Sequence, residues 1–417
     1  MKRRAFCAAG VLATTLCVGG PVATANRGLA PCGPGRFVPD HQGAPARVQG
    51  YFLRRSYAAG ETARLVVTRA PRGTTLQIFH ADVRHAPPRR PDAMSGVAVD
   101  KRIAVHRGTV AVEIGNWPTG VYFARLVHGG DIGFAPFILR PSVYGQNDVA
   151  VVIPTNTWQA ESFMDQDRDG YGDTWYADPR VDVVSLARPF LHRGVPPRFG
   201  HFQYWMWEYG KHADFLSDDD LDAFASAAQL FRLYRLIIFA GHEEYATLHE
   251  FDLTMGYRNL GGNLAFLSSN SFYSQVVRRG NTIRCVGHFR DEGRPEAALI
   301  GVQYLDWNHG VFRNEPYRVV GAQYAPWFFR GTGLRDGKRF GYAYGVEIDA
   351  LAPASPPGIH VLAELPNIFG RGRTAQMTYY VAPSGAKVFA SGAFNFESSQ
   401  SAVTDRLLLN LWAYFTH

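Results

Sequence analysis

The sequence predicts an α/β protein in which a β-sandwich precedes a larger three-layer α/β domain. Two observations support this prediction. Residues 46–141 contain short runs of alternating apolar and polar residues separated by turn residues, which is typical of antiparallel strands. From Asp148 onward, strand-like apolar runs alternate with stretches of helical periodicity, and this predicts a mostly parallel sheet covered by helices on both faces.

The first 25 residues have the composition of a secretory signal peptide. Residues 2–4 are all basic, an apolar stretch follows, and small residues at its end predict cleavage after Ala25. The pair Arg3-Arg4 fits the twin-arginine route as well as the Sec route, so both stay open. No other segment approaches the roughly 18 consecutive apolar residues of a membrane span. We therefore expect a secreted or periplasmic protein without a membrane span.

Charge and cysteine content narrow the choice of partner and compartment. The chain has 43 basic and 36 acidic residues, and three of the basic residues lie in the predicted signal peptide. Such a small excess, without any lysine or arginine run, argues against nucleic-acid binding. Two of the four cysteines also lie in that peptide. Cys32 and Cys285 remain, and the sequence leaves open whether they form a disulfide or stay separate thiols.

The segment after the signal peptide is read as a linker followed by the sandwich. Residues 26–45 are rich in Gly, Pro and Ala without periodicity and predict a linker. Residues 46–142 predict an antiparallel β-sandwich of immunoglobulin type, because their strand runs recur at short, regular spacing. The runs are 48–54, 62–70, 74–82, 108–115, 120–128 and 134–141. Its role is either carbohydrate or partner binding or that of a spacer, since fold alone does not determine function.

Residues 143–417 form the predicted α/β domain. Its predicted strands are 148–154, 180–186, 213–217, 236–241, 263–270 and 387–396, and its predicted helices include 201–210, 219–234 and 404–415. Residues 315–383 are interpreted as loop-heavy, with aromatic residues and glycines interleaved. The segment 236–273 predicts a central βαβ unit, because two short apolar runs flank a stretch with helical spacing.

Each strand of this βαβ unit is followed by small and polar residues, at 241–245 and at 268–271. Ligands bind outside the carboxyl ends of the strands in open parallel sheets, so we expect the functional site there. Ser269 lacks the flanking glycines of a nucleophile elbow and is a weak candidate nucleophile. The oxygen-rich side chains expected nearby, those of Glu161, Glu243, Glu244, Tyr245 and Glu347 beside His242, suit ferric iron more than zinc. The alternative is that Tyr245 and Glu347 only bind loop backbone.

A second candidate metal site lies on the loop after the first strand of this domain. Its carboxylates occupy positions 1, 3, 5 and 9 of a calcium-binding loop, with glycine at position 6. These residues are Asp165, Asp167, Asp169 and Asp173, with Gly170. Tyr176 stands at position 12, where such loops usually have a bidentate glutamate. We expect a structural calcium ion; the alternative is a solvated acidic turn.

Four segments resemble the C-terminal domain of the N,N-dimethylformamidase large-subunit family. They are GHEEY with GGNLAFLSSNSFY, VVIPTNTWQA, GVEID and MTYYVAPSGAKVFASGAFNF, and the resemblance spans about Tyr144 to the C-terminus. It implies a class I glutamine amidotransferase-like α/β fold that lacks the amidotransferase cysteine, with the preceding sandwich also usual in the family. In the amidase itself, a ferric ion held by two tyrosines and a glutamate activates water for amide hydrolysis.

The resemblance implies Tyr245 as one tyrosine ligand and Glu347 as the carboxylate ligand. Relatives tend to have a tyrosine after the TNTWQA stretch, where this chain has Glu161. The leading hypothesis is an exported hydrolase of a non-peptide amide bond, with iron held by Tyr245, Glu347 and Glu161 and a small-molecule amide oriented by His242 or Asn270. The alternative is a non-catalytic, calcium-stabilised extracellular protein that binds a glycan or a peptide.

Overall fold

The computed structural model describes residues 32–33, 35–39, 46–81, 95–190, 199–311, 313, 315–341, 345–394, 396 and 401–417. The predicted signal peptide lies outside these residues, as does most of the predicted linker. Within the described ranges, no helix is long and apolar enough to span a membrane.

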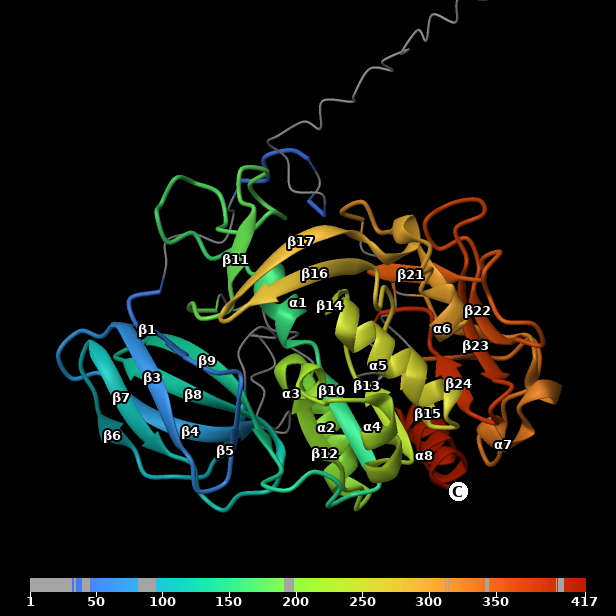
Figure 1. Ribbon diagram of the computed structural model, residues 1–417, viewed down its shortest axis with the longest axis horizontal. Coiled ribbons are helices and arrows are strands. Elements are labelled where there is room, and N and C mark those ends of the chain that lie inside the picture. Colours follow the sequence, from blue (N-terminus) through green and yellow to red (C-terminus); the bar gives the residue numbers. More distant parts are fainter. Residues whose placement is uncertain are drawn as a thin grey trace, which may run out of the picture.

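The first strands of the chain form two facing sheets (Figure 1). One has the order β1-β3-β7, and the other has the order β2-β9-β8-β4-β5, with β6 also paired to β4. The strands are Gln49–Phe52 (β1), Ser56–Ala58 (β2), Thr62–Arg69 (β3), Thr75–Ala81 (β4), Gly96–Ala98 (β5), Ile103–Ala104 (β6), Gly108–Glu113 (β7), Gly120–His128 (β8) and Asp131–Arg140 (β9). Side chains from both sheets, among them Leu65 and Phe137, share one buried core. All six predicted runs contain a strand, whereas the immunoglobulin type stays a prediction.

A nine-stranded sheet forms the centre of the larger part, in the order β12-β10-β13-β15-β24-β23-β22-β19-β20. The first five strands are parallel, and each adjacent pair among the last five is antiparallel, with β24 belonging to both sets. Their bounds are Asp214–Ser217 (β12), Val149–Ile153 (β10), Leu236–Phe239 (β13), Asn263–Phe266 (β15), Lys387–Ala390 (β24), Ala375–Val381 (β23), His360–Leu365 (β22), Tyr317–Val319 (β19) and Arg339–Phe340 (β20). The prediction of a mostly parallel sheet therefore holds for one half only.

The antiparallel half differs from the prediction that residues 315–383 are loop-heavy, because these residues contain β19, β20, β22 and β23. Strands β19 and β20 are three and two residues long, too short to show a period-2 pattern. They are strands because β19 pairs with β22 and β20 pairs with β19, not because of a local pattern.

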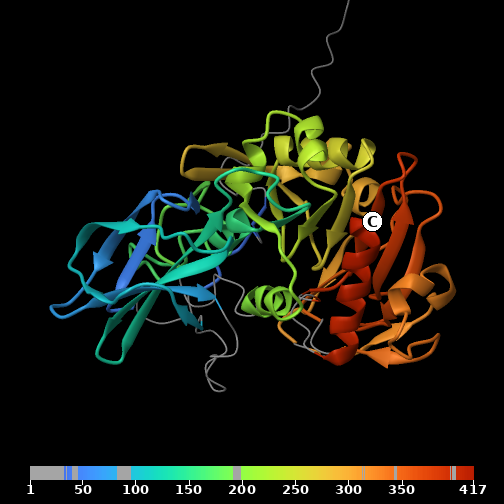
Figure 2. The same ribbon diagram turned by 90° about the horizontal axis from the view of Figure 1, so that it is seen from below.

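Helices cover both faces of the sheet, as predicted. Successive residues of β10 point to opposite faces, so that Val151 joins one core and Val152 the other. One face is covered by α3 (Asp218–Asp222), α4 (Ala227–Leu233), α5 (Leu248–Asn259) and α6 (Ala297–Ile300); the other by α2 (Phe199–Glu208), α7 (Pro326–Phe329) and α8 (Ala402–Thr416). Figure 2 shows α8, in red, lying along the strands. The predicted helix 219–234 is two helices, because the Ser226 hydroxyl accepts from Gln229 N–H and begins α4.

Two smaller sheets complete the fold. One has the order β11-β17-β16-β14 and the other pairs β18 with β21. The strands are Val183–Ser185 (β11), Thr282–His288 (β17), Ser274–Arg279 (β16), Tyr245–Thr247 (β14), Gln303–Trp307 (β18) and Glu347–Ala350 (β21). The predicted strand 180–186 is thus real as β11, but it pairs with β17 and not with the large sheet.

A disulfide joins Cys32 to Cys285 on β17, which answers the question that the sequence left open. The residues that follow Cys32 lie along the aspartate-rich loop: Val38 N–H donates to Ala177 O at 2.8 Å, and the Phe37 and Tyr171 rings are 4.9 Å apart. A disulfide is consistent with an oxidising compartment.

Candidate functional site

Four elements bring polar side chains to the carboxyl edge of the parallel strands. The loop after β13 carries His242 and Glu244 and runs into β14, and the turn after β15 carries Asn270. Strand β10 leads into α1 (Thr155–Ala160), whose C-terminal cap is Glu161. Strand β21 begins with Glu347. The structure therefore brings these candidate residues together at the edge of the sheet that the βαβ unit indicated.

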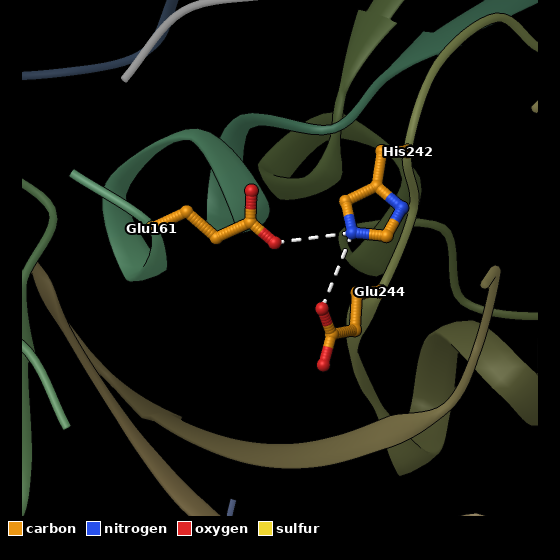
Figure 3. A group of neighbouring side chains, drawn as sticks. All are labelled: Glu161, His242 and Glu244. Atoms are coloured by element: carbon orange, nitrogen blue, oxygen red, sulfur yellow. Dashed lines mark hydrogen bonds and ion pairs between the residues drawn. The ribbon is translucent and has the colours of Figure 1, made fainter. Parts of the chain in front are cut away.

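The His242 ring is the centre of this arrangement, with three glutamates around one nitrogen. Nε2 lies 3.0 Å from a Glu161 oxygen and 3.2 Å from a Glu244 oxygen (Figure 3). It also lies 3.3 Å from a Glu347 oxygen. We call Glu161, His242, Glu244 and Glu347 the front cluster. All but Glu161, whose side chain is 30% exposed, are largely buried.

The other ring nitrogen fixes the orientation of His242. Nδ1 lies 3.0 Å from the carbonyl oxygen of Ser269, and a carbonyl only accepts hydrogen bonds, so Nδ1 carries the hydrogen. Nε2 is therefore the ring nitrogen that faces the glutamates. It either carries a second proton or presents its lone pair to a cation among the carboxylates.

Electrostatics show that the front cluster has an excess of negative charge. Burial alone lowers the pKa of His242, but the surrounding glutamates outweigh it and hold this pKa well above its usual value. Burial raises the pKa of Glu244 and of Glu347, against the opposing effect of His242. One imidazolium cannot balance three ionised carboxylates, so the cluster takes up either protons or a cation.

The spacing of the donor atoms fits a bound metal ion. Two ligands at right angles on an ion, each about 2.1 Å from it, are about 3.0 Å apart, and the contacts to Nε2 span 3.0 to 3.3 Å. Donor atoms of Glu161, His242 and Glu244 all lie within 4.8 Å of one another. Three carboxylates and one imidazole are donors that iron accepts. These residues therefore fit the ion that the resemblance implies.

Tyr245 and Asn270 each present a buried oxygen that lacks a hydrogen-bond partner among the described residues. They are the Tyr245 hydroxyl and the Asn270 Oδ1. Burial raises the pKa of Tyr245 well above its usual value, and the nearby charges of Glu244 and Glu161 raise it further. The Asn270 amide nitrogen donates to Glu347 at 3.2 Å. Trp175 is close enough to the Tyr245 hydroxyl to oppose this rise in pKa as a donor, so the Asn270 Oδ1 is the clearer opening for an ion or a substrate.

Ser269 does not have the surroundings of a nucleophile. Its hydroxyl donates to the backbone oxygen of Glu347 at 2.8 Å and is completely buried. His242 meets the Ser269 carbonyl oxygen and not its hydroxyl. An activated serine needs a base at its hydroxyl, and this geometry does not provide one.

A second acidic group lies on the other side of the loop that carries His242 and Glu244. The carboxyl groups of Asp218 and Glu243 are close enough to share a proton, and Glu250 interacts electrostatically with Asp218. We call Asp218, Glu243 and Glu250 the rear cluster; their exposed fractions are 1%, 2% and 1%. Burial raises the pKa of Asp218 to about 6 and that of Glu243 well above its usual value. A direct bond between two carboxyl groups requires a proton on one of them.

The aspartate-rich loop brings Asp165, Asp167 and Asp169 together, with carboxylate oxygens within 4.8 Å of one another. Asp165 accepts from Gly170 N–H at 3.0 Å, and Asp173 accepts from Gln166 N–H at 3.0 Å. Arg180 forms ion pairs with Asp169 and with Asp178. The loop thus has the turn that calcium binding needs. Arg180 would compete with a calcium ion for the Asp169 carboxylate.

Sequence reasoning brought Glu161, His242, Glu347 and Asn270 to one place but did not assign Glu244 as a ligand. The signal was the spacing in His242-Glu243-Glu244: alternate side chains of an extended segment point the same way, so His242 and Glu244 belong together and Glu243 does not. The central position of the His242 ring could not be predicted from the sequence, because it depends on the contact with the Ser269 carbonyl.

Comparison with known proteins gives a family match. The sequence model of the family described as "N,N-dimethylformamidase beta subunit-like, C-terminal" matches residues 52–405. The match extends from the first strand of the facing sheets into α8, further toward the N-terminus than the resemblance noted from motifs. No curated protein matches the chain.

Solved structures give only weak similarities. The mmIFT52 N-terminal domain aligns over 52% of this chain and 90% of its own, with 13% identity and a TM-score of 0.32. A Paenibacillus sp. cycloisomaltooligosaccharide glucanotransferase, solved with cycloisomaltoheptaose, aligns over 61% of this chain and 35% of its own, with 9% identity and a TM-score of 0.16. Similarities at these scores support no conclusion about this chain.

Proposed function

Since the chain belongs to the N,N-dimethylformamidase beta subunit-like, C-terminal family, we propose that it is an exported, metal-dependent hydrolase of a non-peptide amide C–N bond. The family indicates a dimethylformamidase-like function. Metal dependence, export and the role of each residue are the parts that we propose, together with an immunoglobulin-like domain at 46–142 and an amidotransferase-like fold at 143–417.

One observation supports the metal most strongly: three glutamate oxygens surround a single histidine nitrogen at 3.0, 3.2 and 3.3 Å. Without a cation, the repulsion among the carboxylates opposes this arrangement. We propose iron as the ion, since hard oxygen donors dominate the cluster. A metal ion in such a site lowers the pKa of coordinated water and polarises an amide carbonyl.

We assign the ligand set to Glu161, Glu244, Glu347 and His242, with Tyr245 as a further oxygen ligand. His242 was first expected to orient the substrate, but both of its ring nitrogens are engaged within the site, which favours a role as ligand. Asn270 keeps the substrate-orienting role. Its Oδ1 has no partner among the described residues and can accept a hydrogen bond from an amide N–H, while its amide nitrogen holds Glu347.

Export and calcium binding remain proposals that rest on other observations. The disulfide between Cys32 and Cys285 supports an oxidising compartment, secreted or periplasmic. The three clustered carboxylates of Asp165, Asp167 and Asp169 support a calcium ion that orders their loop.

The function is tested by measuring amine release from a panel of small amides with the purified full-length chain, alongside its metal content. We expect hydrolysis of at least one amide, lost on chelation and restored by iron. Tyr245→Phe should lower metal occupancy and activity. The matched control is Tyr257→Phe, which removes a buried hydroxyl that donates to the Tyr234 carbonyl on another part of the sheet. A colourless, metal-free protein without amidase activity would instead favour a binding protein.

A further inference from the structure

We propose that Ser274 and His288 are positioning residues that hold the Glu244 carboxylate in its metal-binding orientation. This inference rests on the proposed metal site. It concerns a chain of contacts that runs outward from the front cluster and that neither the family match nor the sequence motifs point to.

The Glu244 carboxylate faces two different neighbours. Its Oε2 lies 3.2 Å from His242 Nε2, inside the front cluster. Its Oε1 accepts a hydrogen bond from the Ser274 hydroxyl at 3.1 Å. The Ser274 backbone N–H also donates to the Glu244 backbone oxygen at 3.0 Å, and Ser274 is completely buried. Ser274 therefore forms hydrogen bonds with both the backbone and the side chain of Glu244.

His288 fixes the direction of the Ser274 hydroxyl. The two residues lie directly opposite each other in the pairing of β16 with β17, and Ser274 Oγ is 3.5 Å from His288 Nδ1. A hydroxyl has one hydrogen, and Ser274 gives it to Glu244; His288 Nδ1 must then be the donor to Ser274. The order of donation is His288 to Ser274 to Glu244.

The surroundings of His288 keep this ring in place. It stacks on Tyr273 with ring centres 4.1 Å apart and planes 14° apart. Burial lowers the pKa of His288, so the neutral ring with a single N–H is favoured. A neutral ring whose hydrogen is on Nδ1 supplies the donor that the chain of contacts needs.

Loss of these hydrogen bonds would leave Glu244 Oε1 without a partner and allow the carboxylate to rotate. Partners of this kind orient metal ligands, and their removal typically costs about 10–100-fold in metal affinity. Ser274→Ala and His288→Phe should fall in this range. His288→Phe keeps an aromatic ring against Tyr273 but removes the donor, whereas His288→Asn keeps an N–H donor and loses the ring.

The test is a titration of the metal-free full-length chain with Co²⁺, followed by the visible absorption of the bound ion. We expect Ser274→Ala and His288→Phe to weaken Co²⁺ binding about 10–100-fold and His288→Asn to stay within about threefold of the wild type. The control is His309→Phe, which removes an exposed imidazole that contacts Asp306 and should bind Co²⁺ like the wild type.

The outcomes separate this inference from the proposed function. If the wild type binds no Co²⁺, the proposed metal site itself is wrong. If the wild type binds Co²⁺ and His288→Phe binds it equally well, the positioning role is wrong. If His288→Phe and His288→Asn weaken binding equally, the ring and not its donor matters, which also overturns the inference. Circular dichroism checks folding, and should Ser274→Ala fail to fold, the two His288 variants decide the matter.

Discussion

The front and rear clusters use neighbouring residues of one loop, yet they handle their negative charge differently. His242 and Glu244 point into the front cluster, which has an imidazole at its centre and opens toward solvent at Glu161. Glu243 points the other way, into a rear cluster that is closed and lacks a histidine. Carboxylates around an imidazole, one of them partly exposed, suit a metal ion, whereas enclosed carboxyl groups without an imidazole become protonated.

The rear cluster also satisfies backbone groups, which explains why it is acidic. Asp218 accepts hydrogen bonds from the N–H of Asn156 and the hydroxyl of Thr155, at the beginning of α1. Glu250 accepts from Thr247 N–H as part of the capping box of α5. Acidic side chains at helix N-termini stabilise the helices. The comparison teaches that burial and partners, not residue type, separate a ligand from a structural acid.

The largest effect on metal content and activity should come from replacing Glu243 and Glu244 by glutamine, one at a time. Glu244→Gln should lose the metal and reduce amide hydrolysis by more than about 100-fold, because it removes a ligand rather than its support. Glu243→Gln should keep metal and activity, since its amide can still donate to Asp218. Metal analysis and amine release measure both. Equal losses of metal and activity in the two variants would contradict the assignment of Glu244 as a ligand and Glu243 as a structural acid.

In calcium-free buffer, chelation of the proposed iron should destabilise the protein through the front cluster alone. A ligand present at 100 times its Kd stabilises the fold by about 2.7 kcal/mol, so chelation should lower Tm and metal should restore it. Glu243→Gln should respond like the wild type. Glu244→Gln should show no response, and a clear metal-dependent rise of Tm in that variant would place the ion elsewhere.

The rear cluster should give a pH-dependent stability that the front cluster does not explain. The pKa of Asp218 rises from 3.8 to about 6 on folding, so the unfolded chain releases this proton first and the fold loses stability as pH rises from about 4 to 6. The loss is at most about 3 kcal/mol. Asp218→Asn should therefore raise Tm at pH 7 more than at pH 4.

Thermal unfolding at several pH values measures this effect. The isosteric Asn keeps the acceptor for Asn156 and Thr155 while removing the charge. A Tm of Asp218→Asn that falls at pH 7 would mean that the ionised carboxylate stabilises the fold, contrary to this account.

The smallest effect should come from the aspartate-rich loop, where Asp167 and Asp169 are exposed and Asp165 is buried. Calcium at millimolar concentration should raise Tm slightly, as expected for an extracellular site with a Kd of about 10⁻⁴–10⁻³ M. Arg180→Gln should increase the calcium affinity, because it removes the ion pair to Asp169. Asp167→Asn should abolish the rise. If calorimetric titration with calcium gives no heat of binding in either the wild type or Arg180→Gln, the loop is a solvated acidic turn and not a calcium site.

Much of the fold could be read from the sequence because its strands and helices carry local patterns. The runs that became β10, β13 and β15 are short, apolar and bounded by polar residues, and their parallel order places the site. The antiparallel strands β19 and β20 carry no such pattern and exist through pairing with distant strands. The break between α3 and α4 depends on the Ser226 cap, which competes with helical spacing that continues across it.

The site was predictable in place but not in detail. Parallel strands with polar ends pointed to His242 and Asn270, and the family resemblance pointed to Glu161 and Glu347. What the sequence could not show is that the Ser269 carbonyl orients His242, or that Asp218 is the residue that Glu243 meets. Both depend on contacts between segments that are far apart in the chain.

The most direct test is the metal content of the full-length chain, purified from its own compartment and measured by mass spectrometry together with its visible spectrum. Our account predicts close to one iron per chain and, if Tyr245 binds it, a tyrosinate-to-iron charge-transfer band that Tyr245→Phe removes. A chain that retains calcium alone, or no metal, and shows no such band would contradict the metal-dependent mechanism.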